Sequence, residues 1–241
     1  MNKNANPWDE LGKKTFNTHR SDEIDPQAAD NILIAWPSLL KLITREFPNS
    51  KNISVLDFGC GTGAFCTKLD QMGYKVTGID PSREMVKIAR ANSSKSIKYI
   101  LGDKAKLPKN KFQIITSIMT LPFIEDIGDT IETLVNHLNT GGIFVFADFN
   151  KEWVKECLKK RVSFSDFDSL EDPNKGLKTF GDIKVPVYIR KSEEYERIAR
   201  NNNLSKILEE YPPFTQNFID SYPDKRPKNI SEYMILGYKK N

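Results

Sequence analysis

The sequence predicts an α/β fold in which one mostly parallel, doubly wound sheet carries helices on both faces. The first reason is that residues 51–148 alternate between short apolar runs and amphipathic helical stretches. A second reason is the glycine-rich turn at residues 59–63, which follows the first apolar run directly. The third is Asp80, an acidic residue that closes the second run. Ligands of such sheets bind beyond the carboxyl ends of the strands, so the turn and Asp80 predict where a site lies.

The alternating segments predict the elements in chain order. Strands are expected near residues 53–58, 75–79, 97–101, 112–118 and 143–148. The helices between them are expected near residues 63–72, 82–92 and 127–138. From residue 183 onward the pattern predicts the rest of the same sheet, with strands at 184–190, 204–211 and 233–238 and a capped helix at 192–202.

The glycine turn and Asp80 together indicate a nucleoside site. Gly59 and Gly61 lack a Cβ, so the backbone there can come close to a ligand. Asp80, about 20 residues further on, can accept hydrogen bonds from ribose hydroxyl groups. A dinucleotide is disfavoured, because the G-x-G-x-x-G spacing is not met and residues 64–66 after the turn are Ala-Phe-Cys. A P-loop is excluded, because no Gly-Lys-Ser/Thr follows the glycines. Asp57 would repel a pyrophosphate but suits a cationic group such as an ammonium.

In this order and spacing, the segments resemble the motifs of the class I S-adenosylmethionine-dependent methyltransferases. The matching segments are residues 55–63, 78–85, 100–103, 112–126 and 138–145. An ordered set is far more specific than a single glycine motif. The sequence is most similar to the small-molecule branch, with the ubiquinone, menaquinone and natural-product methyltransferases. The resemblance implies a Rossmann-like, seven-stranded sheet with an antiparallel C-terminal edge strand, S-adenosylmethionine as cofactor and S-adenosylhomocysteine as product.

The resemblance also implies which residues hold the cofactor. Asp57 and the backbone of residues 59–63 would hold the methionyl part, and Asp80 would take the ribose hydroxyl groups. Asp103 would accept a hydrogen bond from the adenine amino group, although a turn or helix cap is an alternative role for it. Ser117 would belong to the wall near the sulfonium. The full implied set is Asp57, Phe58, Gly59, Cys60, Gly61, Gly63, Asp80, Pro81, Met85, Gly102, Asp103, Lys104, Ser117, Met119 and Phe123.

Residues 1–50 are predicted to form a helical segment ahead of the main domain. Pro37 is placed to kink or split the longer of its two helices. In the family this region commonly closes over the cofactor as a lid, which makes Trp8, Phe16 and Trp36 candidates to line the acceptor site. For Trp8 and Phe16, simple docking of two helices by their aromatic faces is the alternative.

Residues 51–241 form the predicted methyltransferase domain, within which residues 149–182 form a substrate-side insertion after the fifth strand. A basic helix opens this insertion, and Phe164 and Phe167 follow it. Both phenylalanines are candidates to contact the acceptor. The alternative is that they anchor the insertion through a small core of its own, since exposed phenylalanine is unfavourable.

Methyl transfer from a sulfonium needs little acid–base chemistry. Positioning alone can lower a barrier by about 7–11 kcal/mol, so a general base is optional. His19 in the N-terminal segment and Asp148 at the end of the fifth strand are the candidates for such a base. Cys60, Cys66 and Cys157 show no metal-ligand spacing, so no metal is expected.

Composition narrows the choice of partners. The chain has 241 residues and a net charge of +4, and it lacks an apolar run long enough to span a membrane. A dedicated nucleic-acid protein is usually more basic, so a small-molecule acceptor is expected and nucleic acid is not. The first residues lack the apolar core of a secretion signal, which predicts a cytoplasmic protein.

Two alternatives stay open. One is a tRNA-modifying methyltransferase, supported only by the basic face of residues 151–161. The other is a protein that binds the cofactor without transferring its methyl group. Methylation at oxygen, nitrogen or carbon is equally compatible with the sequence, and so is any oligomeric state.

Overall fold

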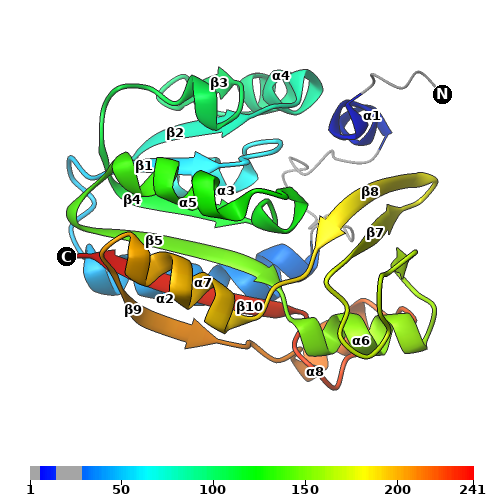
Figure 1. Cartoon of the computed structure of the whole chain (residues 1–241). Helices are drawn as coiled ribbons and strands as arrows, with labels where there is room; N and C mark the ends of the chain where they lie inside the picture. The colour runs from blue at the N-terminus through cyan, green and yellow to red at the C-terminus, as the bar shows by residue number, and fades with distance from the viewer. Residues whose placement is uncertain (1–5, 15–28) are drawn as a thin grey trace.

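A computed structural model describes residues 6–14 and 29–241 of the chain (Figure 1). Its centre is a seven-stranded sheet with the strand order β3-β2-β1-β4-β5-β10-β9. A separate three-stranded sheet has the order β6-β7-β8. The strands of the large sheet are β1 (Ser54–Phe58), β2 (Lys75–Asp80), β3 (Lys98–Leu101), β4 (Phe112–Ile118), β5 (Leu138–Phe149), β9 (Leu204–Glu210) and β10 (Tyr233–Lys240).

The direction of the strands confirms the predicted sheet. β1 pairs in parallel with both β2 and β4, and β4 pairs in parallel with β5. β10 runs antiparallel to β5 and to β9, so the predicted antiparallel C-terminal strand lies one place in from the edge, which β9 forms. The strand order reverses between β1 and β4, and ligands bind at the carboxyl ends of strands beside such a switch point.

Helices cover both faces of the large sheet (Figure 1). Because side chains alternate along a strand, β5 serves two cores: Val145 belongs to one and Phe146 to the other. The first core also contains Leu42, and the second contains Leu134 and Tyr195. The helices of these layers are α2 (Trp36–Glu46), α3 (Ala64–Gln71), α4 (Arg83–Asn92), α5 (Ile127–Asn136) and α7 (Ser192–Asn201).

The N-terminal helices have different roles. α1 (Pro7–Lys14) packs beside α4, away from the sheet (Figure 1). The predicted break near Pro37 is confirmed: a π-helical turn, η1 (Asn31–Ala35), precedes α2. Pro37 lies in the first turn of α2 and has no N–H to donate, so the regular α-helical hydrogen bond from residue 37 to the preceding turn is missing. α2 packs on β5 and β10 with Leu42 buried, so it covers one face of the sheet.

The insertion consists of α6 and the small sheet. Its elements are α6 (Lys151–Lys159), β6 (Phe164–Ser165), β7 (Lys175–Phe180) and β8 (Ile183–Tyr188). The prediction that β8 joins the large sheet is wrong, because β8 turns back at Gly181 and pairs with β7. Alternation along β8 shows that one face is buried, but it does not say against which strand. The small sheet thus continues past residue 182 to Tyr188.

Two further observations complete the fold. A short helix, α8 (Gln216–Ser221), lies between β9 and β10. In the described ranges, no helix is both long enough and apolar enough to cross a bilayer.

Candidate cofactor and acceptor site

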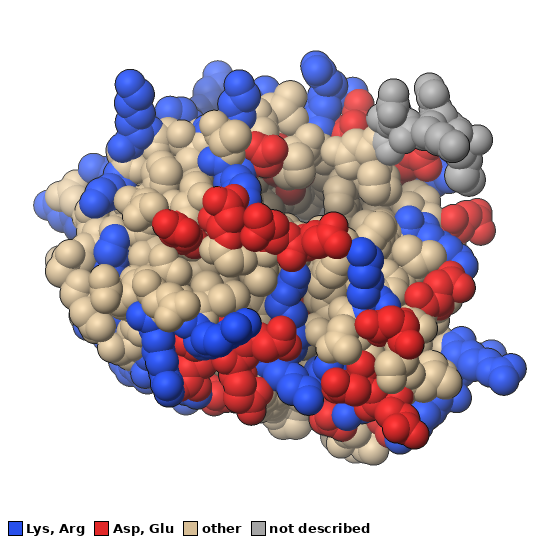
Figure 2. Space-filling model, viewed as in Figure 1, with Lys and Arg blue, Asp and Glu red and all other residues tan. Residues whose placement is uncertain are grey.

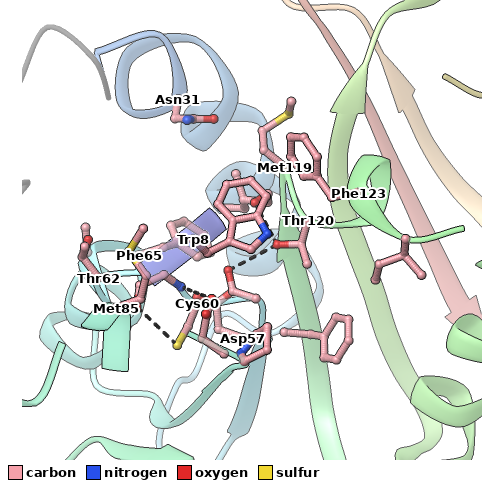
Figure 3. A pocket seen from close by; sticks show the side chains of 18 of the residues that line it. Trp8, Asn31, Asp57, Cys60, Thr62, Phe65, Met85, Met119, Thr120 and Phe123 are labelled. Atoms are coloured by element: carbon pink, nitrogen blue, oxygen red, sulfur yellow. Dashed lines mark hydrogen bonds between the residues drawn. The ribbon is translucent and has the colours of Figure 1, made fainter. Parts of the chain in front are cut away.

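A cavity of about 450 Å³ lies at the carboxyl ends of β1, β2 and β4. Figure 2 shows the molecule hollowed near the middle of the face that it presents. The walls come from the glycine turn, α1, η1, the short helix η3 (Leu121–Phe123), the end of β7 and residues 226–233. In the close view, Asp57 and Cys60 lie toward one side of the cavity and Met119 and Phe123 toward the other (Figure 3).

The glycine turn is fixed to β2 and leaves room for a ligand. The N–H groups of Gly59 and Cys60 both donate to the carbonyl of Ile79, at 2.8 and 3.0 Å. Gly61 has a φ of +53°, and a Cβ built on it would meet no atom within 4 Å. Its α-carbon therefore faces open space in the cavity, as the backbone of a ligand cradle must.

Asp57 and Asp80 are the buried acids at this end. The Asp80 carboxylate accepts hydrogen bonds from the N–H groups of Gly61 and Ser82, at 2.9 and 2.8 Å. Asp57 accepts one from Thr116 Oγ1 at 2.7 Å. Burial raises the pKa of each to about 6, because desolvation disfavours the charged form. Among described residues no cation pairs with either acid, so both can still bind an ammonium or hydroxyl donors from a ligand.

The adjoining surface suits a flat ring. Pro81, Met85, Gly102 and Asp103 line the cavity beyond Asp80. Asp103 also accepts a hydrogen bond from the Ala105 N–H at 2.9 Å, so it caps the following turn as well. Both roles proposed for this residue from the sequence are therefore compatible with its position.

The opposite end of the cavity is aromatic. Its aromatic wall consists of Trp8, Phe123, Phe149 and Phe180. The ring of Phe123 lies 4.7 Å from that of Trp8, 6.2 Å from that of Phe180 and 6.4 Å from that of Phe149, measured between centroids. The wall joins segments from four parts of the chain and gives that side of the cavity an apolar surface.

Charged side chains border the aromatic wall. Arg226 Nη1 lies 2.7 Å from a carboxylate oxygen of Asp30 and 3.3 Å from one of Glu232. Arg226 Nη2 pairs with Asp224 at 2.8 Å. Burial raises the pKa of Glu232 to about 8 and lowers the pKa of Lys178, since each would be charged in a poorly hydrated place.

The structure brings most of the predicted site residues together. Those that line the cavity are Trp8, Trp36, Asp57, Phe58, Gly59, Cys60, Gly61, Asp80, Pro81, Met85, Gly102, Asp103, Met119 and Phe123. Phe16 and His19 lie outside the described residues. Three or more His, Cys, Asp or Glu side chains placed to hold a metal ion are not found among the residues that the structure describes.

Three predicted cofactor residues do not face the cavity. Gly63 caps α3, and a Cβ there would meet the ring of Tyr99, so packing accounts for this glycine. Lys104 instead pairs with Asp129 on α5. Ser117 is fully buried and donates to the carbonyl of Phe58 at 3.0 Å, which ties β4 to β1.

The candidate acceptor residues of the insertion also lie elsewhere. Phe164 packs against Trp153 and Phe149, with ring centroids 6.0 and 5.3 Å away. Phe167 packs against Gly176, where a Cβ would collide with its ring. Neither lines the cavity, which corresponds to the anchoring alternative.

Asp148 is the clearest correction. It is fully buried on the opposite face of β5, where Tyr195 OH donates to one carboxylate oxygen and the Phe149 N–H to the other. Successive side chains of a strand point to opposite faces, so the next residue, Phe149, reaches the cavity and Asp148 does not. Burial raises the pKa of Asp148 to about 7.

Several cavity residues were missed from the sequence. The polar ones are Asp30, Asn31, Thr62, Thr120, Lys178, Arg226 and Glu232, and the aromatic ones are Phe65, Phe149, Phe180 and Tyr233. Only the parity of β5 could have indicated Phe149. Phe65 closely follows the glycine turn, whereas the places of Lys178, Phe180, Arg226 and Glu232 depend on how the β7–β8 hairpin and the 211–232 loop pack.

The comparisons with known proteins agree with this geometry. Residues 34–208 match the model of a family described as the methyltransferase domain. A malonyl-[acyl-carrier protein] O-methyltransferase of Buchnera aphidicola is 31% identical over 179 residues, which is 72% of this chain and 70% of that protein. A ubiquinone biosynthesis O-methyltransferase of Bradyrhizobium diazoefficiens is 29% identical over 105 residues, or 42% of each chain.

The fold has similar solved structures. An S-adenosylmethionine-dependent methyltransferase from Mesorhizobium loti superimposes with a TM-score of 0.68 at 21% identity, covering 85% of this chain and 97% of that one.

Several curated relatives are matched over about half of their length or less. The chain belongs to the methyltransferase-domain family, and the predicted class of S-adenosylmethionine-dependent methyltransferases is confirmed.

Proposed function

We propose that this protein transfers a methyl group from S-adenosylmethionine to an oxygen of a small acceptor that lies on the aromatic wall. One observation carries the proposal: a single cavity has an acidic, glycine-lined end and an aromatic end. The first suits a cationic nucleoside, and the second suits an apolar partner.

The residues at the acidic end fit the cofactor. Asp57 is buried without a cation and would pair with the ammonium of the methionyl part, and Asp80 would accept from the ribose hydroxyl groups. The open side of Gly61 leaves space for the ligand. When bound, the cofactor supplies a methyl group activated by the positive charge on its sulfur.

The aromatic end would position the acceptor and keep water away from it. Trp8 and Phe123 would hold an acceptor at the mouth of the cofactor end and exclude water from it. Orientation of this kind can contribute about 7–11 kcal/mol to lowering the barrier. The names of the Buchnera and Bradyrhizobium relatives, both O-methyltransferases, favour oxygen as the atom that is methylated.

The surface gives little support to a tRNA substrate. On α6, Lys155 and Lys159 pair with Glu152 and Glu156 at 2.8 and 2.6 Å, and Lys151 is buried against Asp172. The basic face of this helix is therefore largely neutralised. In Figure 2 acidic side chains gather beside the hollow, which disfavours a polyanion there.

Calorimetric titration tests the proposal. S-adenosylmethionine and S-adenosylhomocysteine should bind wild-type protein with micromolar affinity, bind Asp80→Ala at least tenfold more weakly, and bind the surface variant Asp220→Ala as they bind wild type. NADH should not bind. Methyl-labelled cofactor with a panel of hydroxy, carboxy and amino acceptors then tests transfer. Absence of cofactor binding would overturn the proposal, whereas binding without transfer to any acceptor would favour a cofactor-binding protein.

A further inference from the structure

Lys178 is the least expected residue of the cavity. It lies in the middle of β7, where its backbone is opposite Phe164 of β6 and Val185 of β8. The residue is only 8% exposed, yet it lines the cavity. Its Nζ atom thus lies at the hairpin end of the site, next to the aromatic wall.

Three aromatic rings lie close to this ammonium. Nζ lies 4.6 Å from the ring centroid of Phe164, 5.5 Å from that of Phe180 and 5.7 Å from that of Phe149. No hydrogen bond or ion pair joins Nζ to any residue in the described ranges. Cation–π contacts offset part of the cost of burying a charge, but a buried ammonium normally also has an anionic or hydrogen-bonding partner.

No acid of the described residues lies within ion-pair distance of Nζ, although the charge of nearby Glu232 opposes the burial that lowers the pKa of Lys178. Glu232 and Asp30 are the nearby acids, and both are paired with Arg226 at 3.3 and 2.7 Å. Arg226 in turn pairs with these two acids and with Asp224, so three carboxylates already surround its guanidinium. Burial also favours the neutral form of Glu232, with a pKa of about 8. Among the described residues that line the cavity, Lys178 is therefore the cation without an ion-pair partner, and it can pair with a ligand.

The occupant can be specified by its charge. A single ammonium beside neighbours that are already paired suits a group with one negative charge, whereas a phosphate group carries more charge and more acceptor oxygens. Phenols are neutral near pH 7. The rings around Lys178 match an apolar body next to the anionic group.

We propose that the methyl acceptor carries a carboxylate that pairs with Lys178, while its apolar part lies on the aromatic wall. This inference rests on the proposed function and names the substrate class for it. It concerns binding only, and it applies whether the carboxylate or another oxygen of the acceptor receives the methyl group.

Matched pairs of probes test the proposal. Benzoate, phenylacetate, hexanoate and decanoate, each with its neutral amide, are titrated into protein saturated with S-adenosylhomocysteine. At least one carboxylate should bind wild type tenfold or more tightly than its amide. Lys178→Met should abolish this preference, and Lys178→Arg should keep most of it. Lys184→Met, which removes an exposed lysine of the same hairpin, should keep all of it.

The outcomes separate the two proposals. If S-adenosylhomocysteine binds but no carboxylate is preferred over its amide in wild type, or if Lys178→Met keeps the preference, the role of Lys178 is overturned and the proposed function stands. If inorganic phosphate binds in a Lys178-dependent way and the carboxylates do not, the carboxylate assignment is wrong. Failure to bind S-adenosylhomocysteine overturns the proposed function itself. Thermal melting shows that each variant is folded, and Lys178→Gln replaces Lys178→Met if that variant is not.

Discussion

Asp9 on α1 accepts a hydrogen bond from Ser82 Oγ at 2.6 Å, and this bond ties the N-terminal helix to the turn that follows Asp80. The same Asp9 oxygen accepts from the Glu84 N–H at 3.2 Å. Ser82 meanwhile caps α4 by accepting from the Met85 N–H. The helix that carries Trp8 is thus fastened to the residues that face the cofactor end.

This tether predicts that Asp9→Ala weakens cofactor binding. Without the two hydrogen bonds, α1 spends less time over the cavity, so the affinity for S-adenosylhomocysteine should fall about five- to tenfold. Overall stability should fall by only about 1 kcal/mol, the typical value of such hydrogen bonds. Calorimetry checks the affinity, and Lys14→Ala on the exposed face of α1 is the control. Equal affinities of Asp9→Ala and wild type would show that α1 does not contribute to binding.

Gly61→Ala should separate binding from stability. Its methyl group would occupy open cavity space at a φ of +53°, so cofactor affinity should fall tenfold or more. The left-handed backbone costs roughly 1–2 kcal/mol for alanine. Gly181→Ala is a matched control, since it also has a positive φ and an open surrounding but lies in the β7–β8 turn. Urea unfolding should show a similar loss of unfolding free energy in both variants, and only Gly61→Ala should lose affinity for the cofactor.

Phe180→Ala should affect the acceptor and not the cofactor. Phe180 contacts Trp8 and Phe123, and aromatic pairs contribute about 0.5–1.5 kcal/mol each beyond buried area. The KM for an acceptor found in the panel should rise about tenfold, with the affinity for S-adenosylhomocysteine unchanged. Phe167→Ala removes a ring of the same insertion outside the cavity and should leave KM unchanged. An equal rise in both variants would mean that general loosening of the insertion is responsible.

Asp148→Asn should change the pH dependence of stability. The pKa of Asp148 rises from 3.8 to about 7 on folding, so the wild type must bury a charge above pH 7, while the unfolded chain is ionised from about pH 4. The stability that this neutral carboxyl contributes is full at low pH and is lost as the pH rises toward 7. At about 1.4 kcal/mol per pKa unit, the effect amounts to a few kcal/mol.

Urea unfolding from pH 5 to 8 measures this difference. Asp148→Asn should gain stability relative to wild type as the pH rises, since the amide carries no charge to bury. Methyl transfer at pH 7.5 should be unchanged, because the side chain lies on the face of β5 away from the cavity. A hundredfold loss of transfer with intact folding would restore Asp148 as a candidate base.

The cofactor end could be predicted from the sequence because its residues are local. The glycine turn and Asp80 end two neighbouring strands, and each strand was visible as a short apolar run. The same local pattern wrongly predicted that Gly63 faces the cofactor, because in a sequence a glycine required by packing against Tyr99 cannot be told from one required by a ligand. The prediction that Asp148 faces the cavity was wrong by one residue, because successive side chains of β5 point to opposite faces.

The acceptor end could not be predicted in this way. Lys178 and Glu232 reach the cavity from segments more than fifty residues apart, and neither segment carries a motif. The β7–β8 hairpin pairs with itself and not with the large sheet, a choice that strand alternation leaves undetermined. Sequence periodicity indicates that a face is buried, and only tertiary packing decides which cavity it borders.

A crystal structure of the protein with S-adenosylhomocysteine tests the central claim most directly. The ribose hydroxyl groups are expected on Asp80 and the ammonium beside Asp57, with the sulfur facing the aromatic wall of Trp8, Phe123, Phe149 and Phe180. Density for the ligand at any other site, or at this site with the ribose away from Asp80, would contradict it.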